Sequence, residues 1–260
     1  LEPHNVFRFF DKISRIPRPS KKEERIITYN QDFGKSRSLE TITDKIGNVL
    51  IRKPATIGKE LAPTVVLQAH MDMVCEKNAN VEHDFLNDAI KTYIDGDWIR
   101  AHGTTLGADN GIGIAAILAV LDANNLEHGN IEALFTVDEE TGLTGAFALE
   151  SNLLKGDILI NLDSEDDGEL FIGCAGGCDT IATFNYTEDV ADGRMFFFTV
   201  TVSGLLGGHS GDDIDKGRAN ANKLLVEYLV RIAKQTTLRI CHIDGGNLRN
   251  AIAREASVVA

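Results

Sequence analysis

The segment TVVLQAHMD, residues 64–72, ends an apolar run with a histidine and an aspartate that could do chemistry. In an extended strand, side chains two positions apart project to the same side, so we expect His70 and Asp72 to lie together at the strand end. An imidazole beside a carboxylate is the arrangement of a metal ligand and the acceptor that orients it. The pair could equally be no more than the polar end of a strand.

Acidic residues follow two other expected strands and open one expected helix. They are Glu139 and Glu140 after IEALFTV, Asp163 after ILINL, and Asp109 in LGADNG, just before an apolar helix. Ligand sites of open α/β sheets lie at the carboxyl ends of strands. We therefore expect these side chains to converge in one crevice with His70.

Each of these residues taken alone has a structural explanation. His70 could be a buried polar residue with a hydrogen-bond partner, Asp109 could cap its helix, and the two glutamates could be solvated acids. Four carboxylates at one sheet edge, however, repel one another unless a cation is present. Imidazole and carboxylate oxygen suit zinc or manganese, and hydrolytic sites of this type often hold two ions about 3.5 to 4 Å apart. The sequence therefore favours a metal centre, with one glutamate binding metal and the other acting as general base.

Strands alternate with helices through residues 43–163, which predicts an α/β fold with a central mixed, largely parallel sheet flanked by helices. Before them, residues 6–33 are expected to be mostly helical, with PRPS as a turn and Ser20 and Glu23 as a capping box. A further helix is expected over residues 144–154.

The pattern changes near residue 181 to strand-like runs, a glycine-rich loop and one helix. This change predicts two domains, a metal-binding α/β domain at 1–180 and a second, α+β domain at 181–260.

The composition excludes several classes of partner. The chain of 260 residues has a formal net charge of −13, which disfavours nucleic acid and anionic membrane surfaces. Its apolar runs are shorter than the roughly 20 residues of a spanning helix, and its N-terminus does not resemble a secretory leader. The 4 cysteines are too few to crosslink a chain of this length, and Cys174 and Cys178 are spaced more widely than the common zinc pair. We therefore expect a cytoplasmic protein with free thiols.

The motifs HMD, GADNG, DEETG and LDSEDDGELFIGCAGG resemble the metal-site motifs of the M20 metallopeptidases. The segments AHGTTLGADNGIGIA, GNVLIRKPA, QAHMDMV, GLLGGHSG, NANKLL and LRNAIAREA resemble, more particularly, its aminoacyl-histidine dipeptidase branch, also called peptidase D or cytosolic non-specific dipeptidases. The similarity extends over nearly the whole chain. It implies a zinc-peptidase-like catalytic domain at 1–180 and the first part of an α+β lid domain at 181–260.

The resemblance implies a site for two zinc ions, with cobalt or manganese as substitutes. His70, Asp109 and Asp163 would hold one ion. Asp109 and Glu140 would hold the other, so that Asp109 bridges the two.

The remaining residues would act on the substrate or support the ligands. Glu139 would be the general base, and Asp72 would orient the imidazole ligand. His209 of GGHSG would contact the substrate or its tetrahedral intermediate from the lid, and Asn250 would contact the substrate's carboxylate. Homodimers occur in this family, so a homodimer is also expected.

Two features depart from the family pattern. Ala253 stands where the family usually has a proline, which predicts a looser turn. The family also continues beyond the motif EASVVA and supplies from there a histidine to the second ion, so we expect this chain to be part of a longer protein rather than a truncated one.

The expected function is metal-dependent hydrolysis of unblocked dipeptides, including Xaa-His, by a water that two zinc ions activate. The alternatives are another M20 hydrolase, such as a tripeptidase or an amidohydrolase of acylated amino acids, and a truncated, non-catalytic metal-binding module.

Overall fold

The computed structural model describes residues 1–78, 80–164, 166, 168–174, 176, 178, 180–191, 193, 195–211, 213–246, 249 and 251–260. It contains two compact units, Leu1–Gly176 and Gly177–Ala260. This division lies within a few residues of the expected boundary, and the roles expected for the two parts stay predictions.

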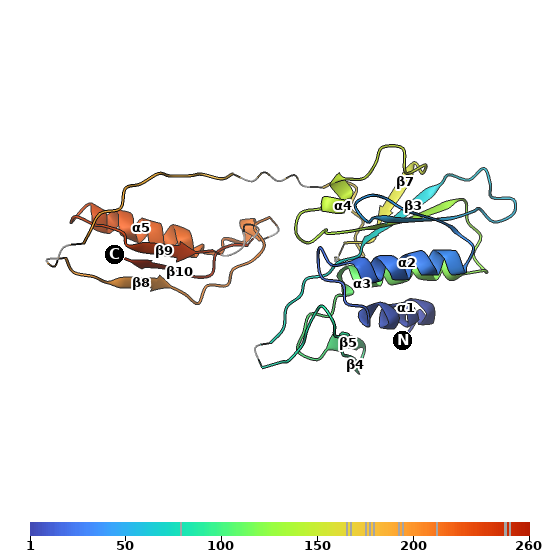
Figure 1. Ribbon diagram of the computed structural model, residues 1–260, viewed down its shortest axis with the longest axis horizontal. Helices are drawn as coiled ribbons and strands as arrows, with labels where there is room; N and C mark the ends of the chain where they lie inside the picture. The colour runs from blue at the N-terminus through green and yellow to red at the C-terminus, as the bar shows by residue number, and fades with distance from the viewer. Residues whose placement is uncertain are drawn as a thin grey trace. The chain divides into compact units, whose positions relative to one another are not determined.

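The first unit is built on a five-stranded sheet in the order β1-β2-β6-β3-β7 (Figure 1). The strands are β1 (Glu40–Thr43), β2 (Val49–Lys53), β3 (Val65–His70), β6 (Ile131–Thr136) and β7 (Ile158–Asn161). β3 pairs in parallel with β6 and β7, whereas β2 is antiparallel to β1 and β6. The expected α/β class with a mixed central sheet is therefore confirmed.

Three helices cover one face of this sheet: α1 (His4–Ser14), α2 (Glu24–Ser36) and α3 (Ala108–Asp122) (Figure 1). α1 and α2 each bury one apolar stripe, and α3, which is apolar nearly all round, is buried over most of its length, as expected. Their side chains form the main core with those of β2, β3 and β6. This packing fixes the start of α3 beside the carboxyl end of β3.

The helix expected over residues 144–154 is wrong in its extent, because only α4 (Thr144–Phe147) forms. Leu149 and Leu153 have helical spacing, but Asn152 between them adopts left-handed backbone, with φ of 69°. The segment after α4 instead packs its leucines as irregular chain against the second face of the sheet.

The capping box expected from Ser20 and Glu23 is also wrong. The Ser20 hydroxyl donates to Asp72 Oδ2 at 2.7 Å, and Glu23 Oε1 accepts from the backbone N–H groups of Lys21 and Asp138 at 3.0 and 2.9 Å. Both side chains therefore serve tertiary contacts rather than the first turn of α2.

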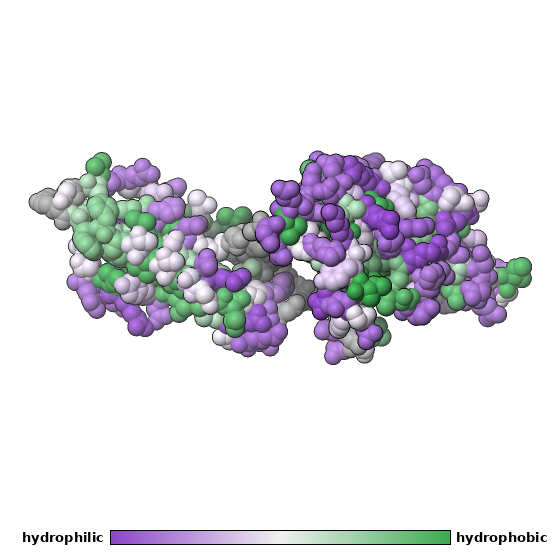
Figure 2. Space-filling view, turned by 90° about the horizontal axis from the view of Figure 1, so that it is seen from below, coloured by the Kyte–Doolittle hydropathy of each residue, from purple (hydrophilic) through white to green (hydrophobic). Residues whose placement is uncertain are grey.

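A hairpin of β4 (Thr92–Asp95) and β5 (Trp98–Ala101) lies between β3 and α3 in the chain. The face of the first unit that Figure 2 shows is mostly hydrophilic, in keeping with the acidic composition.

The second unit is α+β, as expected. A three-stranded antiparallel sheet has the order β8-β10-β9, formed by β8 (Thr199–Val202), β9 (His242–Gly245) and β10 (Ala256–Val259). Helix α5 (Ala221–Ala233) packs on it, and a short 3₁₀ turn, η1 (Ile214–Lys216), precedes the helix. Ala253 is buried in this core, and its carbonyl accepts from Ala221 N–H at 2.9 Å. Among the residues that the structure describes, no helix has the length and apolarity needed to cross a membrane.

Candidate metal centre

His70, the last residue of β3, is 1% exposed and lies among three aspartates. Its Nδ1 is 3.2 Å from Asp72 Oδ1, and its Nε2 is 2.9 Å from Asp109 Oδ1 and 3.4 Å from Asp163 Oδ1. β3 runs parallel to β6 and β7, so its carboxyl end meets the residues that follow those strands. The parallel pairing thus brings together side chains that are far apart in sequence.

Asp72 is fully buried and accepts hydrogen bonds from four groups. Oδ1 faces His70 Nδ1 and the backbone N–H of Glu139, and Oδ2 accepts from the Ser20 hydroxyl and the backbone N–H of Glu140. Burial alone raises the pKa of Asp72, but the hydrogen bonds from His70, Glu139 and Ser20 lower it to about 2. Asp72 is therefore ionised at neutral pH and fixes both the His70 ring and the start of the DEETG loop.

Asp109 and Asp163 approach the other side of the His70 ring. Asp109 stands at the first turn of α3, where the backbone at Asp109 and Asn110 is not helical and the peptide bond between the two is cis. The Asn110 side-chain amide donates to Asp163, which lies just after β7. Burial raises the pKa of Asp163, but hydrogen bonds from His70 and Asn110 bring it below its usual value. These contacts hold the three acceptors around one imidazole.

Glu139 and Glu140 follow β6, and their backbone N–H groups are anchored on Asp72. Burial raises the pKa of Glu140 to about 7, and the charge of Asp109 contributes to this rise. Burial also raises the pKa of Glu139, against the lowering effect of His70. The two carboxylates thus lie in a partly dehydrated, strongly negative environment.

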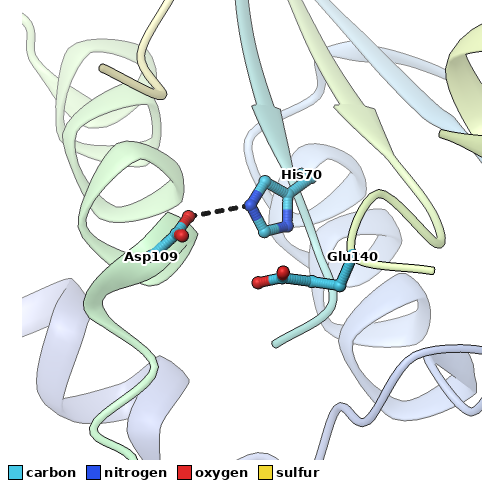
Figure 3. A group of neighbouring side chains, drawn as sticks. All are labelled: His70, Asp109 and Glu140. Carbon is cyan, nitrogen blue, oxygen red and sulfur yellow. Dashed lines mark hydrogen bonds and ion pairs between the residues drawn. The ribbon is translucent and has the colours of Figure 1, made fainter. Parts of the chain in front are cut away.

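The side chains of His70, Asp109 and Glu140 form a group with the composition of a metal site. One ligand atom from each lies within 4.8 Å of the others, and Figure 3 shows the two carboxylates turned toward the space beside the ring. Burial lowers the pKa of His70, but hydrogen bonds to Asp109, Asp163 and Asp72 raise it to about 12. This surplus of negative charge around a buried imidazole fits a bound cation, and the donor set suits zinc.

A second buried acidic group, Glu23, Asp72 and Asp138, also brings its carboxylate oxygens within 4.8 Å of one another. Its charges are met by local donors, because Asp138 accepts from the hydroxyl groups of Thr141 and Thr144. The sequence analysis did not predict this group, nor the hydrogen bonds that Ser20 and Asn110 donate to Asp72 and Asp163, because neither Ser20 nor Asn110 follows a strand end.

The two residues expected to contact the substrate belong to the second part of the chain. His209 belongs to the second unit, where its backbone N–H donates to Asp213 Oδ2 at 2.8 Å and its Nδ1 accepts from Gly211 N–H at 3.1 Å. Asn250 lies outside the described residues.

The chain is similar to peptidases of known sequence and structure. Residues 200–260 match the peptidase dimerisation domain of the M20 family. The cytosol non-specific dipeptidase of Escherichia coli (strain K12) is 49% identical over 256 residues, which are 98% of this chain and 53% of that protein. The chain thus spans about half the length of this curated relative.

Solved structures agree with the sequence comparison. The crystal structure of aminoacylhistidine dipeptidase from Vibrio alginolyticus superposes with a TM-score of 0.71 at 48% identity, covering 100% of this chain and 53% of that one. Aminopeptidase PepT from Bacillus cereus, at 20% identity and a TM-score of 0.57, covers 98% of this chain and 65% of its own and shares the fold. The sequence and structural matches together show that the chain belongs to the M20 family of peptidases.

Proposed function

We propose that the protein carrying this chain hydrolyses the peptide bond of unblocked dipeptides, Xaa-His among them, at a two-zinc centre. The observation that carries the proposal is the convergence of His70, Asp109 and Glu140 ligand atoms within 4.8 Å of one another. It is supported by the similarity to a protein named as a cytosol non-specific dipeptidase and to one named as an aminoacylhistidine dipeptidase.

One ion would be held by His70, Asp109 and Asp163, and the other by Asp109 and Glu140. Asp109 is suited to the bridging position because its carboxylate contacts His70 and belongs to the same group as Glu140. Cobalt or manganese would be accepted by the same oxygen and nitrogen donors in place of zinc.

Asp72 would set the tautomer of the imidazole ligand. With the Nδ1 proton directed at Asp72, the lone pair of His70 Nε2 is free to bind metal on the side where Asp109 and Asp163 lie. The bound zinc would polarise the scissile carbonyl and lower the pKa of water.

Glu139 would act as the general base. Its carboxylate would accept the proton of the attacking water and pass it to the nitrogen of the leaving amino acid. Its neighbour Glu140 would be the metal ligand, and the backbone N–H groups of both glutamates are anchored on Asp72.

The second unit would act as the start of a lid. His209 would contact the substrate or its tetrahedral intermediate, and Asn250 would contact the substrate's carboxylate. The first part, 1–180, would be the catalytic domain, and the lid would begin at 181.

We also propose a homodimer in the cytoplasm. The match of residues 200–260 to a peptidase dimerisation domain supports the dimer, and so do the exposed apolar side chains of Leu224 and Tyr228 on α5. Figure 2 shows hydrophobic side chains spread over this unit. Sedimentation velocity tests the dimer, and a monomer at micromolar concentration would contradict it.

Hydrolysis of Ala-His by the purified protein, with zinc added and with a chelator as control, tests the function. Turnover that the chelator abolishes is expected. N-acetyl-Ala-His and Ala-Ala-His, offered in parallel, distinguish the amidohydrolase and tripeptidase alternatives. Tight zinc binding without turnover of any of the three substrates would contradict the proposal and indicate a non-catalytic module.

A further inference from the structure

The turn of residues 17–20, PRPS, lies between α1 and α2 in the chain and contacts the segments that carry the candidate metal ligands. Arg18 in this turn is 2% exposed, and its guanidinium group donates to three backbone carbonyl oxygens. Nη1 donates to Met71 O at 3.0 Å and to Asp72 O at 2.7 Å, and Nη2 donates to Gly107 O. These carbonyls belong to two separate segments of the chain, which Arg18 therefore joins.

The two joined segments carry the expected ligands. Met71 directly follows His70 at the end of β3, and Gly107 lies two residues before Asp109 at the start of α3. The separation of His70 Nε2 and Asp109 Oδ1, 2.9 Å, thus depends on how far apart these segments are held. A planar guanidinium group with several fixed donors can hold both at once, which a lysine ammonium cannot do in the same geometry.

Two glycines, Gly107 and Gly111, leave room for the guanidinium group. A Cβ added at Gly107 would lie 2.7 Å from Arg18 Nη2, and one added at Gly111 would lie 2.8 Å from the same atom. Gly107 also has left-handed backbone, with φ of 68°. Glycine at both positions lets the loop before α3 close onto the guanidinium group.

Core packing alone does not account for a charged residue here. Arg18 Nε has no hydrogen-bond partner among the described residues although it is buried. A buried donor without a partner destabilises the fold, and an apolar side chain of similar volume is often neutral or stabilising at such a position. The arginine is therefore better explained by the backbone carbonyl groups that it binds than by its contribution to core packing.

Ser20 provides a second contact from the same turn. Its hydroxyl donates to Asp72 Oδ2 at 2.7 Å, on the oxygen that does not face His70. Arg18 thus binds the backbone just after His70 and just before Asp109. Ser20 binds the carboxylate that orients His70.

We propose that the 17–20 turn positions the metal centre, with Arg18 as a positioning residue that sets the separation of His70 and Asp109. The inference rests on the proposed function, because it assigns the turn a role in metal binding. It predicts that metal affinity depends on the guanidinium fork itself and not only on its positive charge or on overall stability.

Arg18→Lys is the discriminating variant, because it keeps the charge and loses the fork. We expect its zinc affinity, measured by competition with a chromophoric chelator, to fall about tenfold or more, as is usual when a partner that supports metal ligands is removed. The visible absorption of the cobalt-loaded protein should also change, because the ligands are held differently.

Arg52→Lys is the matched control. Arg52 has a side chain that is 16% exposed, and it donates to the Leu153 carbonyl at 2.6 Å and to Glu132 Oε1 at 2.8 Å. Arg52 pairs with Glu132 near the beginning of β6, whereas His70 pairs with Thr136 at the end of that strand. The control is therefore at the end of β6 away from the metal centre. This control should lose stability to urea while keeping zinc affinity and the cobalt spectrum of the wild type.

Unchanged zinc affinity in Arg18→Lys, or an equal loss in Arg52→Lys, would overturn the inference and leave the proposed function intact. If Arg18→Lys does not fold, Ser20→Ala decides in its place, because it removes one hydroxyl group from a partly buried position: weaker zinc binding supports the turn's role, and wild-type binding overturns it. A wild-type protein that binds no zinc would overturn the proposed function and the inference together.

Discussion

Replacing Asp72 with asparagine tests whether one buried carboxylate organises the centre. Oδ1 is 3.2 Å from His70 Nδ1 and 3.0 Å from the Glu139 nitrogen, whereas Oδ2 is 2.7 Å from the Ser20 hydroxyl and 3.2 Å from the Glu140 nitrogen. An asparagine of nearly the same shape has a single acceptor oxygen, so an NH₂ group must face one of these two pairs of donors.

The orientation of the asparagine amide that leaves fewer hydrogen-bond donors unpaired sets the size of the expected loss of stability. With the NH₂ group at the Oδ2 position, the Ser20 hydroxyl can rotate to accept, and only the Glu140 N–H loses its acceptor. With the NH₂ group at Oδ1, both His70 and Glu139 lose theirs. The first arrangement leaves one buried donor unpaired, which costs about 1–3 kcal/mol in the free energy of unfolding. In this arrangement a neutral amide oxygen, not a charged carboxylate, faces His70 Nδ1 and raises the basicity of the imidazole less, so we expect zinc affinity to fall about 10- to 100-fold.

Urea denaturation and zinc competition measure the two effects separately, with Glu132→Gln as the control. Glu132 has a side chain that is 3% exposed and accepts from Arg52 Nε, Lys155 N–H and Gly156 N–H at 2.8, 2.7 and 2.9 Å. Its replacement should destabilise the fold without changing zinc affinity. Equal losses of zinc affinity in the two variants, or wild-type affinity in Asp72→Asn, would refute the assigned role of Asp72.

Three further outcomes are expected. Glu139→Gln should lower kcat for Ala-His about 10²- to 10⁴-fold while zinc stays bound, and wild-type kcat would contradict a general-base role. Asp109→Ala should abolish binding of both ions by elemental analysis, whereas loss of one ion alone would argue against a bridge. Burial raises the pKa of Asp122, but hydrogen bonds from Arg37 and Arg8 bring it below its usual value. Because the folded-state pKa is the lower one, this contribution to stability is present above about pH 4, the unfolded-state pKa, and is lost as the pH falls through the folded-state pKa. The stability difference between wild type and Asp122→Asn in urea should therefore shrink in acid, and a difference independent of pH would refute the linkage.

The convergence of residues at the sheet edge could be predicted because it depends on two short-range features. Apolar runs identify β3, β6 and β7, and a polar residue directly after each run identifies its end. The rule that parallel strands share a carboxyl edge then brings His70, Glu140 and Asp163 together without any knowledge of distances. The roles of these residues in metal binding stay proposals.

Features that depend on long-range geometry could not be predicted in the same way. Nothing in the local pattern shows that β2 runs antiparallel to β6, since both read as apolar runs. The leucines after α4 have helical spacing, but the left-handed backbone of Asn152 ends the pattern. Arg18 reads as a solvated residue in a turn between prolines, and only the fold shows it buried beneath two distant segments.

The free energies of the competing hydrogen bonds bear on why the expected capping box does not form. A serine at a helix N-terminus contributes typically about 1 kcal/mol through one hydrogen bond to a neutral backbone N–H. A hydrogen bond to a charged group is worth about 1.5–3 kcal/mol, and the Ser20 hydroxyl donates one to the carboxylate of Asp72, whereas α2 begins only at Glu24, after Lys21 in left-handed backbone. Glu23 also serves a tertiary contact, because its carboxylate accepts the backbone N–H of Asp138, the first residue of the DEETG loop. Where strand ends predict a buried acidic cluster, serine and glutamate in a preceding turn are better assigned to that cluster than to the helix that follows them.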